Sequence, residues 1–245
     1  MTYKLLALDM DGTLLNDKKI ISDQNRIWIR QAVEAGITVC MATGRGRPNI
    51  VPFLQQLELD TPFVAVNGSE VWADSHNLRS RQVIEPELIR QMHRLADGHD
   101  TWYWAYGSRQ VYTKSNWIDN IESEIWMKFG IYTEHLPTLT ALTEEIASWG
   151  KLEMTNSDPL NIEMNPLGIS KATGLREVCE LVGCQFTEMI AAGDSLNDEQ
   201  MIRAAGLGVA MGNAQQAVKD EADLVIPSNE EDGIAYLIKN YILNG

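Results

Sequence analysis

Two aspartates, Asp9 and Asp11, are the residues of this chain with the clearest chemical potential. They stand two positions apart at the end of the first apolar run, residues 4–9, and Gly12 follows them. The apolar run is typical of a buried strand, and the Asp-Gly pair is typical of a turn. Both carboxylates are therefore expected where the strand ends. Two such anions repel by on the order of several kcal/mol at a protein-like dielectric. The spacing therefore indicates that one carboxyl binds a proton or that both face a hard metal ion.

Polar side chains also follow two later apolar runs. Thr43 and Gly44 come at the end of the run at residues 37–43, and Asp194 follows the run at residues 188–192. Ligands of open parallel sheets bind beyond the carboxyl ends of the strands, where the strand order reverses. If the three strand ends converge, carboxylate oxygens dominate the site, and such a set with room for water suits Mg²⁺. The predicted ligands are Asp9, Asp11, Asp194 and Asp198.

This constellation predicts phosphoryl transfer. With Mg²⁺ bound, Asp9 can attack phosphorus and form an acyl phosphate, which divides a difficult hydrolysis into two easier steps. Asp11 is close enough to give a proton to the leaving oxygen and later to take one from water. The Thr43 hydroxyl and nearby backbone N–H groups can donate hydrogen bonds to the phosphate, and Lys171 can supply a fixed positive charge.

Composition and charge exclude several other classes of function. The chain has 245 residues, of which 44% are hydrophobic, and its net charge of −14 leaves no basic block for nucleic acid or an anionic membrane. An anionic substrate therefore needs a locally positive pocket. The three cysteines are odd in number and show neither C-x-x-C nor Cys/His zinc spacing. The first residues lack the apolar segment of a signal peptide, and no run approaches the roughly 18 apolar residues of a membrane helix. A cytoplasmic protein is expected, and its oligomeric state cannot be predicted.

Helices and strands alternate in the two outer parts of the chain, which predicts a parallel sheet with helices on both faces. An Asn-Gly pair at residues 67–68 predicts a hairpin between the strand at 63–66 and residues 69–72. The other strands are predicted at residues 4–9, 37–43, 188–192, 208–211 and 224–226, and the helices at 22–35, 46–57, 170–181, 197–205, 214–221 and 232–243.

The middle of the chain has a different pattern, which predicts an inserted α+β domain. Helices are expected at residues 86–96 and 117–129, and strands at 101–106, 110–113, 151–155 and 161–164. The even-numbered aromatic residues Trp102, Trp104 and Tyr106 share one strand face, either for packing between domains or as a wall for the substrate. The predicted organisation is a Rossmann-like core of residues 1–81 and 166–245, with a cap formed by residues 82–165.

Four motifs carry a resemblance to a known family. They are DMDGTL at residues 9–14, ATGR at 42–45, SK at 170–171 and GDSLND at 193–198. Their order resembles that of the haloacid dehalogenase superfamily phosphatases, and the long insertion between the second and third motifs resembles the Cof-like subgroup with a large α/β cap (type IIB). The resemblance implies an α/β fold with that cap, a phosphatase activity and a Mg²⁺ cofactor.

The resemblance also implies roles for individual residues. Asp9 resembles the nucleophile and a metal ligand, and Asp11 resembles the acid/base, which offers its backbone carbonyl to the metal. Dehalogenases of the superfamily lack this second aspartate, so Asp11 favours phosphate over halide. The remaining implied roles are phosphate binding by Thr43, Gly44, Lys171 and Asn197, direct metal ligation by Asp194, and second or outer-shell ligation by Asp198.

The sequence thus predicts a phosphatase that hydrolyses a small phosphorylated metabolite. Sugar phosphates, flavin mononucleotide and pyridoxal phosphate are the candidate substrates. Two alternatives stay open at this point: a phosphomutase or phosphotransferase that uses the same aspartyl-phosphate, and a non-catalytic phosphate-sensing switch that also gathers acids around magnesium.

Overall fold

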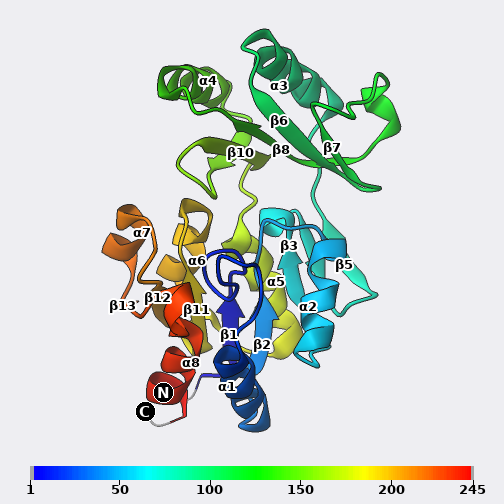
Figure 1. Ribbon diagram of the computed structural model, residues 1–245. Helices are drawn as coiled ribbons and strands as arrows, with labels where there is room; N and C mark the ends of the chain where they lie inside the picture. Colours follow the sequence, from blue (N-terminus) through cyan, green and yellow to red (C-terminus); the bar gives the residue numbers. More distant parts are fainter. Residues whose placement is uncertain (1–2, 244–245) are drawn as a thin grey trace.

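The computed structural model describes residues 3–243 and shows two packed parts, one built on a parallel sheet and the other on an antiparallel sheet (Figure 1). We call these parts the core and the cap. The chain passes from core to cap after β5 (Leu78–Arg81) and returns after β10 (Asn161–Pro166). The α/β fold class and the inserted cap region are as predicted, whereas the domain boundaries given above stay a prediction.

The core sheet brings the expected strand ends together. Its order is β13-β12-β11-β1-β2 with parallel pairing throughout, so β1 lies between β11 and β2. Strand β1 is apolar along its whole length because Leu6 and Leu8 pack into one buried cluster and Leu5 and Ala7 into another on the opposite face. The strands are β1 Leu5–Leu8, β2 Thr38–Met41, β11 Met189–Gly193, β12 Leu207–Ala210 and β13 Leu224–Val225.

Helices cover both faces of this sheet. Ser22 caps α1, with its hydroxyl accepting from the Asn25 N–H, and Ser170 caps α5 with a capping box that includes Thr173. Each cap fixes where a helix begins after a loop, and the second one places Lys171 at the first turn of α5. The core helices are α1 Asp23–Glu34, α2 Val51–Gln56, α5 Lys171–Val182, α6 Glu199–Ala204, α7 Gln216–Glu221 and α8 Gly233–Leu237.

The predicted hairpin is present, but it belongs to a separate small sheet. Strands β3 (Phe63–Ala65), β4 (Glu70–Trp72) and β5 pair antiparallel, and an isolated parallel bridge joins Val64 of β3 to Ala42, the residue after β2. The turn places Val66 and Asn67 at positive φ, which asparagine tolerates well. The hairpin therefore carries the Asn67 side chain toward the cap.

The cap is a five-stranded antiparallel sheet in the order β7-β6-β8-β10-β9. Helices α3 and α4 cover its outer face, away from the core (Figure 1). Because side chains alternate along a strand, the other face carries Trp104, Lys128 and Glu163 toward the core. The elements are α3 Pro86–Gly98, β6 Trp102–Gly107, β7 Val111–Thr113, β8 Trp126–Tyr132, α4 Leu136–Ser148, β9 Leu152–Thr155 and β10.

Three sequence predictions need correction. The helix expected at residues 117–129 is wrong, because β8 occupies the centre of the cap sheet and pairs with β6 and β10 on its two sides. Helix α4 was not predicted, although Leu139, Leu142 and Ile146 follow a helical spacing. The helix expected at 46–57 is broken into a 3₁₀ turn and α2, since Pro48 and Pro52 have no N–H to donate.

Within residues 3–243, no helix combines the length and apolar character needed to cross a bilayer.

Glu124 in the cap offers a test of local stability. Burial opposes its ionisation, but hydrogen bonds from Ser108, Arg109 and Tyr112 outweigh burial and lower the pKa of Glu124 to about 2. We expect Glu124→Gln to lower the free energy of unfolding by about 1–2 kcal/mol at pH 7. Because the pKa of Glu124 is lower in the folded than in the unfolded protein, its carboxylate stabilises the fold at pH values above the unfolded pKa of about 4.3. This stabilisation is lost as the pH falls toward 2. Urea unfolding at pH 7, 4 and 3 should show a shrinking difference; a constant difference would contradict this account.

Candidate active site

Three of the four acidic residues predicted to converge do so at the carboxyl ends of β1 and β11. Carboxylate oxygens of Asp9, Asp194 and Asp198 all lie within 4.8 Å of one another. Asp9 and Asp198 are buried, and Asp194 is partly exposed. The Asp11 carboxylate lies outside this group of three among the described residues, so any part it plays in metal binding rests on its backbone carbonyl.

Lys171 holds the acidic group together. Its buried ammonium group donates to Oδ1 of Asp9 and Oδ1 of Asp198, both at 2.6 Å. Burial opposes a charge here, but the two aspartates outweigh burial and raise the pKa of Lys171. The other Asp198 oxygen accepts from the backbone N–H groups of Asp194 and Ser195. Asp198 therefore has both oxygens occupied and fixes the loop after β11, whereas Asp9 keeps one oxygen that accepts no hydrogen bond from the described residues.

The electrostatics of Asp9 and Asp194 fit a bound cation. Burial, reinforced by Asp198, raises the pKa of Asp194 to about 6. The pKa of Asp9 is raised well above its ordinary value by burial, and the neighbouring aspartates add to this despite Lys171. Two carboxyl groups that resist ionisation side by side are stabilised by a divalent ion, and an all-oxygen donor set suits Mg²⁺. The residues present thus fit the metal, although they do not establish which ion binds.

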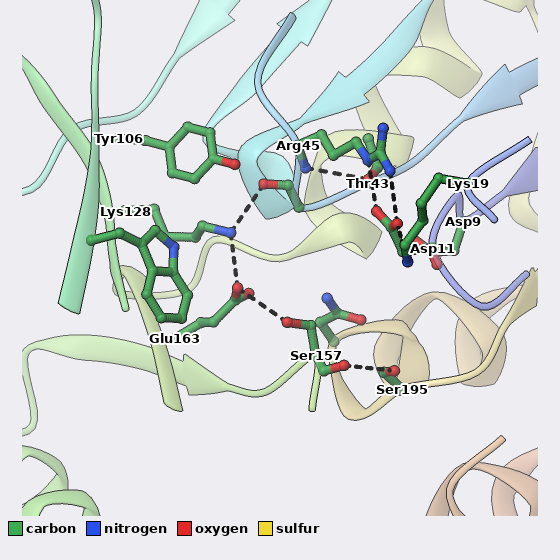
Figure 2. A pocket seen from close by; sticks show the side chains of 13 residues that line it. Asp9, Asp11, Lys19, Thr43, Arg45, Tyr106, Lys128, Ser157, Glu163 and Ser195 are labelled. Atoms are coloured by element: carbon green, nitrogen blue, oxygen red, sulfur yellow. Dashed lines mark hydrogen bonds and ion pairs between the residues drawn. The ribbon is translucent and has the colours of Figure 1, made fainter. Parts of the chain in front are cut away.

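Asp11 has a separate environment (Figure 2). Arg45 makes two hydrogen bonds to its carboxylate, at 2.6 and 2.7 Å, and Lys19 makes a third contact at 2.8 Å. Burial acts against ionisation, but these donors outweigh it and lower the pKa of Asp11 to about 2. In this arrangement Asp11 is an anion at neutral pH.

Three of the four predicted phosphate-binding residues line the same space, whereas the fourth, Lys171, is buried against Asp9 and Asp198. Thr43 is buried and its Oγ1 accepts from the Arg45 N–H at 3.2 Å, which orients the loop after β2. Gly44 has no room for a side chain, because a Cβ there would lie 2.9 Å from Oδ1 of Asn67. Asn197 donates from Nδ2 to that same oxygen at 3.4 Å. Thr43, Gly44 and Asn197 all line one cavity with Asp9.

This cavity lies between core and cap and measures about 360 Å³. Figure 2 shows Tyr106, Lys128 and Glu163 entering it from the cap, opposite Asp9 and Asp11 of the core. Lys19, Arg45 and Lys128 line it together with the carboxylates of Asp9, Asp11 and Glu163, so the cavity offers an anionic substrate cationic groups that are themselves paired with acids.

Several lining residues were missed from the sequence. Lys128 is a lone charge among apolar residues of β8, which was the available signal, and Glu163 is its partner in β10, between Ile162 and Met164. Trp104 and Tyr106 line the cavity, and Tyr106 also packs against the core. The packing role is thus present for Tyr106, and the role as a wall for the substrate stays a prediction.

Comparison with known proteins identifies the family. The sequence profile of the haloacid dehalogenase-like hydrolases matches residues 6–140 and 114–238. The chain belongs to this family. It is a phosphatase of the haloacid dehalogenase superfamily, as the motifs and the strand-end aspartates predicted.

The haloacid dehalogenase relatives match over the full chain. A 5-amino-6-(5-phospho-D-ribitylamino)uracil phosphatase of Bacillus subtilis, YcsE, is 42% identical over 98% of this chain and 96% of its own length. Pyridoxal phosphate phosphatase YbhA of Escherichia coli is 31% identical over 99% of this chain and 100% of its length. The solved structure of the subclass IIB sugar phosphatase BT4131 superposes with a TM-score of 0.85, at 22% identity, over 97% of this chain and 98% of that one. The fold, cap included, is that of the Cof-like type IIB group.

Proposed function

We propose that this chain is a Mg²⁺-dependent phosphatase that hydrolyses a small phosphomonoester through an aspartyl-phosphate on Asp9. The observation that carries the proposal is the position of Asp9 at the end of β1, with one oxygen held by Lys171 and the other accepting no hydrogen bond from the described residues. Asp9, Asp194 and Asp198, with the Asp11 carbonyl, would hold the ion. Bound Mg²⁺ would neutralise negative charge on the carboxylates and the phosphate.

The protein groups divide the reaction into two steps. In the first, an Asp9 oxygen forms a bond to phosphorus, the ester P–O bond breaks, and Asp11 gives a proton to the leaving alcohol. In the second, water attacks the same phosphorus, Asp11 takes its proton, and inorganic phosphate leaves Asp9. Phosphate entering the cavity brings negative charge beside Asp11 and competes for Arg45 and Lys19, and both effects raise the pKa of Asp11 toward that of a usable acid.

The proposed substrate is a phosphorylated polyol or sugar, first of all 5-amino-6-(5-phospho-D-ribitylamino)uracil. The name of the 42% identical relative supports this choice. The aromatic rings of Trp104 and Tyr106 in the cavity wall could stack on a flat ring, which also suits pyridoxal phosphate. The three cysteines are free and buried, in keeping with the cytoplasm as the proposed compartment.

A panel of phosphorylated metabolites, scored by released phosphate, tests this proposal. We expect turnover with Mg²⁺, loss of turnover after chelation by EDTA, and recovery when Mg²⁺ is restored. Product analysis with sugar acceptors distinguishes hydrolysis from transfer of the phosphoryl group to a second hydroxyl. Turnover that survives complete removal of divalent ions would contradict the metal-dependent mechanism.

Asp11→Asn should reveal the acid/base step through its dependence on the leaving group. Asparagine cannot give a proton, and general acid catalysis contributes about 10²–10⁴-fold. We therefore expect a fall in kcat within that range for an alkyl phosphate and a much smaller fall for p-nitrophenyl phosphate, whose leaving group needs little protonation. Equal losses on both substrates would contradict an acid role for Asp11.

A further inference from the structure

We propose that Glu163, a cap residue, is a positioning residue for the phosphate-binding part of the site. This inference rests on the proposed function, in which Thr43, Gly44 and Asn197 bind phosphate. Glu163 is buried on the inner face of the cap sheet. Its Oε1 accepts from Lys128 Nζ at 3.0 Å, and its Oε2 accepts from Asn67 Nδ2 at 2.6 Å. The reaction described above uses none of these three side chains.

Glu163 determines which way the Asn67 amide faces. A carboxylate can only accept hydrogen bonds, so the Asn67 NH₂ group must face it and the Asn67 oxygen must point away. Asn165 favours the same orientation: its own NH₂ group donates to Val66 O and Ser69 Oγ, both at 2.9 Å, so its oxygen is the atom that faces Asn67. The Asn67 oxygen is thereby presented to the core.

That oxygen contacts both segments proposed to bind phosphate. It accepts from Asn197 Nδ2 at 3.4 Å, which leaves the second hydrogen of that NH₂ group for a ligand. The Asn67 backbone N–H donates to Thr43 O at 3.0 Å, so the hairpin is also tied to the loop after β2. One amide, oriented by the cap, thus sets the position of Asn197 relative to Thr43.

Lys128 extends the same control to Gly44. Its ammonium group donates to Glu163 in the cap, as Figure 2 shows, and to the Gly44 carbonyl in the core, at 3.0 Å each. A Cβ at Gly44 would lie 3.2 Å from this ammonium, so the loop is confined between Lys128 and Asn67. The Glu163 carboxylate therefore connects the cap to both walls of the phosphate site, and the geometry of those walls depends on the cap being seated on the core.

The test measures binding of inorganic phosphate separately from turnover. Mutation of a residue that hydrogen-bonds to a metal ligand typically changes metal affinity or activity by about 10–100-fold, and we expect a partner of phosphate-binding residues to have an effect of this order. With Mg²⁺ present, we expect Glu163→Gln to raise the phosphate Kd, by calorimetry, by at least about tenfold. We expect kcat/KM to fall by the same factor for p-nitrophenyl phosphate and pyridoxal phosphate. Asn67→Gly, which keeps the left-handed backbone, should behave likewise and serves if Glu163→Gln does not fold.

Two further variants distinguish positioning from a general loss of folding. Glu124→Gln is the matched control, because it removes an equally buried cap carboxylate outside the site, and it should leave the phosphate Kd unchanged. The double variant Glu163→Gln with Asn67→Asp exchanges acid and amide, so Asn197 again faces an oxygen, and it should recover most of the affinity lost in Glu163→Gln.

Three results would overturn the proposal. An unchanged phosphate Kd in Glu163→Gln, with a loss confined to one substrate, would make Glu163 a leaving-group contact. An equal rise of the phosphate Kd in Glu124→Gln would show that the effect comes from lost stability. If the double variant recovered no phosphate affinity, the orientation of the Asn67 amide would not be the cause. Absence of wild-type turnover on every ester would instead refute the proposed function, while phosphate binding would still decide the role of Glu163.

Discussion

Replacing Asp9 with asparagine is expected to lower kcat by at least about 10⁴-fold, because an amide cannot form the acyl phosphate on which both steps depend. The measurement is steady-state hydrolysis of p-nitrophenyl phosphate with Mg²⁺. Asp23→Asn is a suitable control, since its carboxylate is exposed and pairs with Arg26 on the surface of α1. A variant that retained more than a few per cent of wild-type kcat would rule out Asp9 as the nucleophile.

The same substitution should stabilise the metal-free protein. The pKa of Asp9 is raised in the folded state, so its ionisation opposes folding, increasingly so as the pH rises above the ordinary value for aspartate of about 3.9. Asp9→Asn removes that penalty, while the asparagine oxygen can still accept from Lys171 and Asp198 keeps the lysine paired, so thermal unfolding in EDTA at pH 7–8 should occur at a higher temperature than in the wild type. Mg²⁺ should then stabilise the wild type more than the variant. Lost activity together with gained stability would separate a catalytic role from a structural one.

The core part of the site could be predicted because its residues follow directly from local sequence. Asp9 stands one residue after β1 and Asp194 one residue after β11, and parallel neighbours bring such positions to one edge of the sheet. The alternation of helices and strands indicates a parallel sheet, and the structure adds the strand order that makes β1 and β11 neighbours. Thr43 likewise lies just after the carboxyl end of a parallel strand, β2.

The cap part of the site could not be predicted in this way. Lys128 and Glu163 meet because β8 and β10 pair antiparallel with Met164 opposite Phe129, a register that depends on contacts more than thirty residues apart. Residues 117–129 carry enough apolar side chains for a helix, and only the pairing of β8 with two neighbours decides for a strand. Asn67 was recognised as a turn residue, but its link to Glu163 requires the cap to be in place.

Core and cap thus contribute different things to one cavity. The core supplies the reacting carboxylate and its charge environment, fixed by α5 and the loop after β11. The cap closes the cavity with Tyr106. Through Glu163 and Lys128 it also holds the loop after β2, which contains Thr43 and Gly44. In the proposed mechanism, substrate entry requires this contact to open and closure restores it, so chemistry and cap position are coupled through a small set of hydrogen bonds.

Lys171→Met is the substitution for which we expect the largest combined effect on stability and activity. It leaves Asp9 and Asp198 buried without their shared cation, and breaking a buried ion pair typically costs about 3–5 kcal/mol. We also expect kcat to fall by about 10²–10³-fold, because a fixed charge beside the transferring phosphoryl group is lost. Lys114→Met, which removes a lysine paired with Asp100 on the cap surface, should change neither quantity by a comparable amount.

The pH dependence of the Lys171→Met deficit identifies its cause. The raised pKa of Lys171 means that its stabilisation is complete below the ordinary lysine value of about 10.4 and disappears only at higher pH, so the lysine does not titrate between pH 5 and 8. In the variant the unpaired carboxylates take up a proton as the pH falls, and the loss of stability relative to wild type should therefore shrink from pH 8 to pH 5. Added Mg²⁺ should reduce the same deficit at pH 8. A deficit that is constant with pH and unaffected by Mg²⁺ would point to lost packing instead of an uncompensated pair of buried charges.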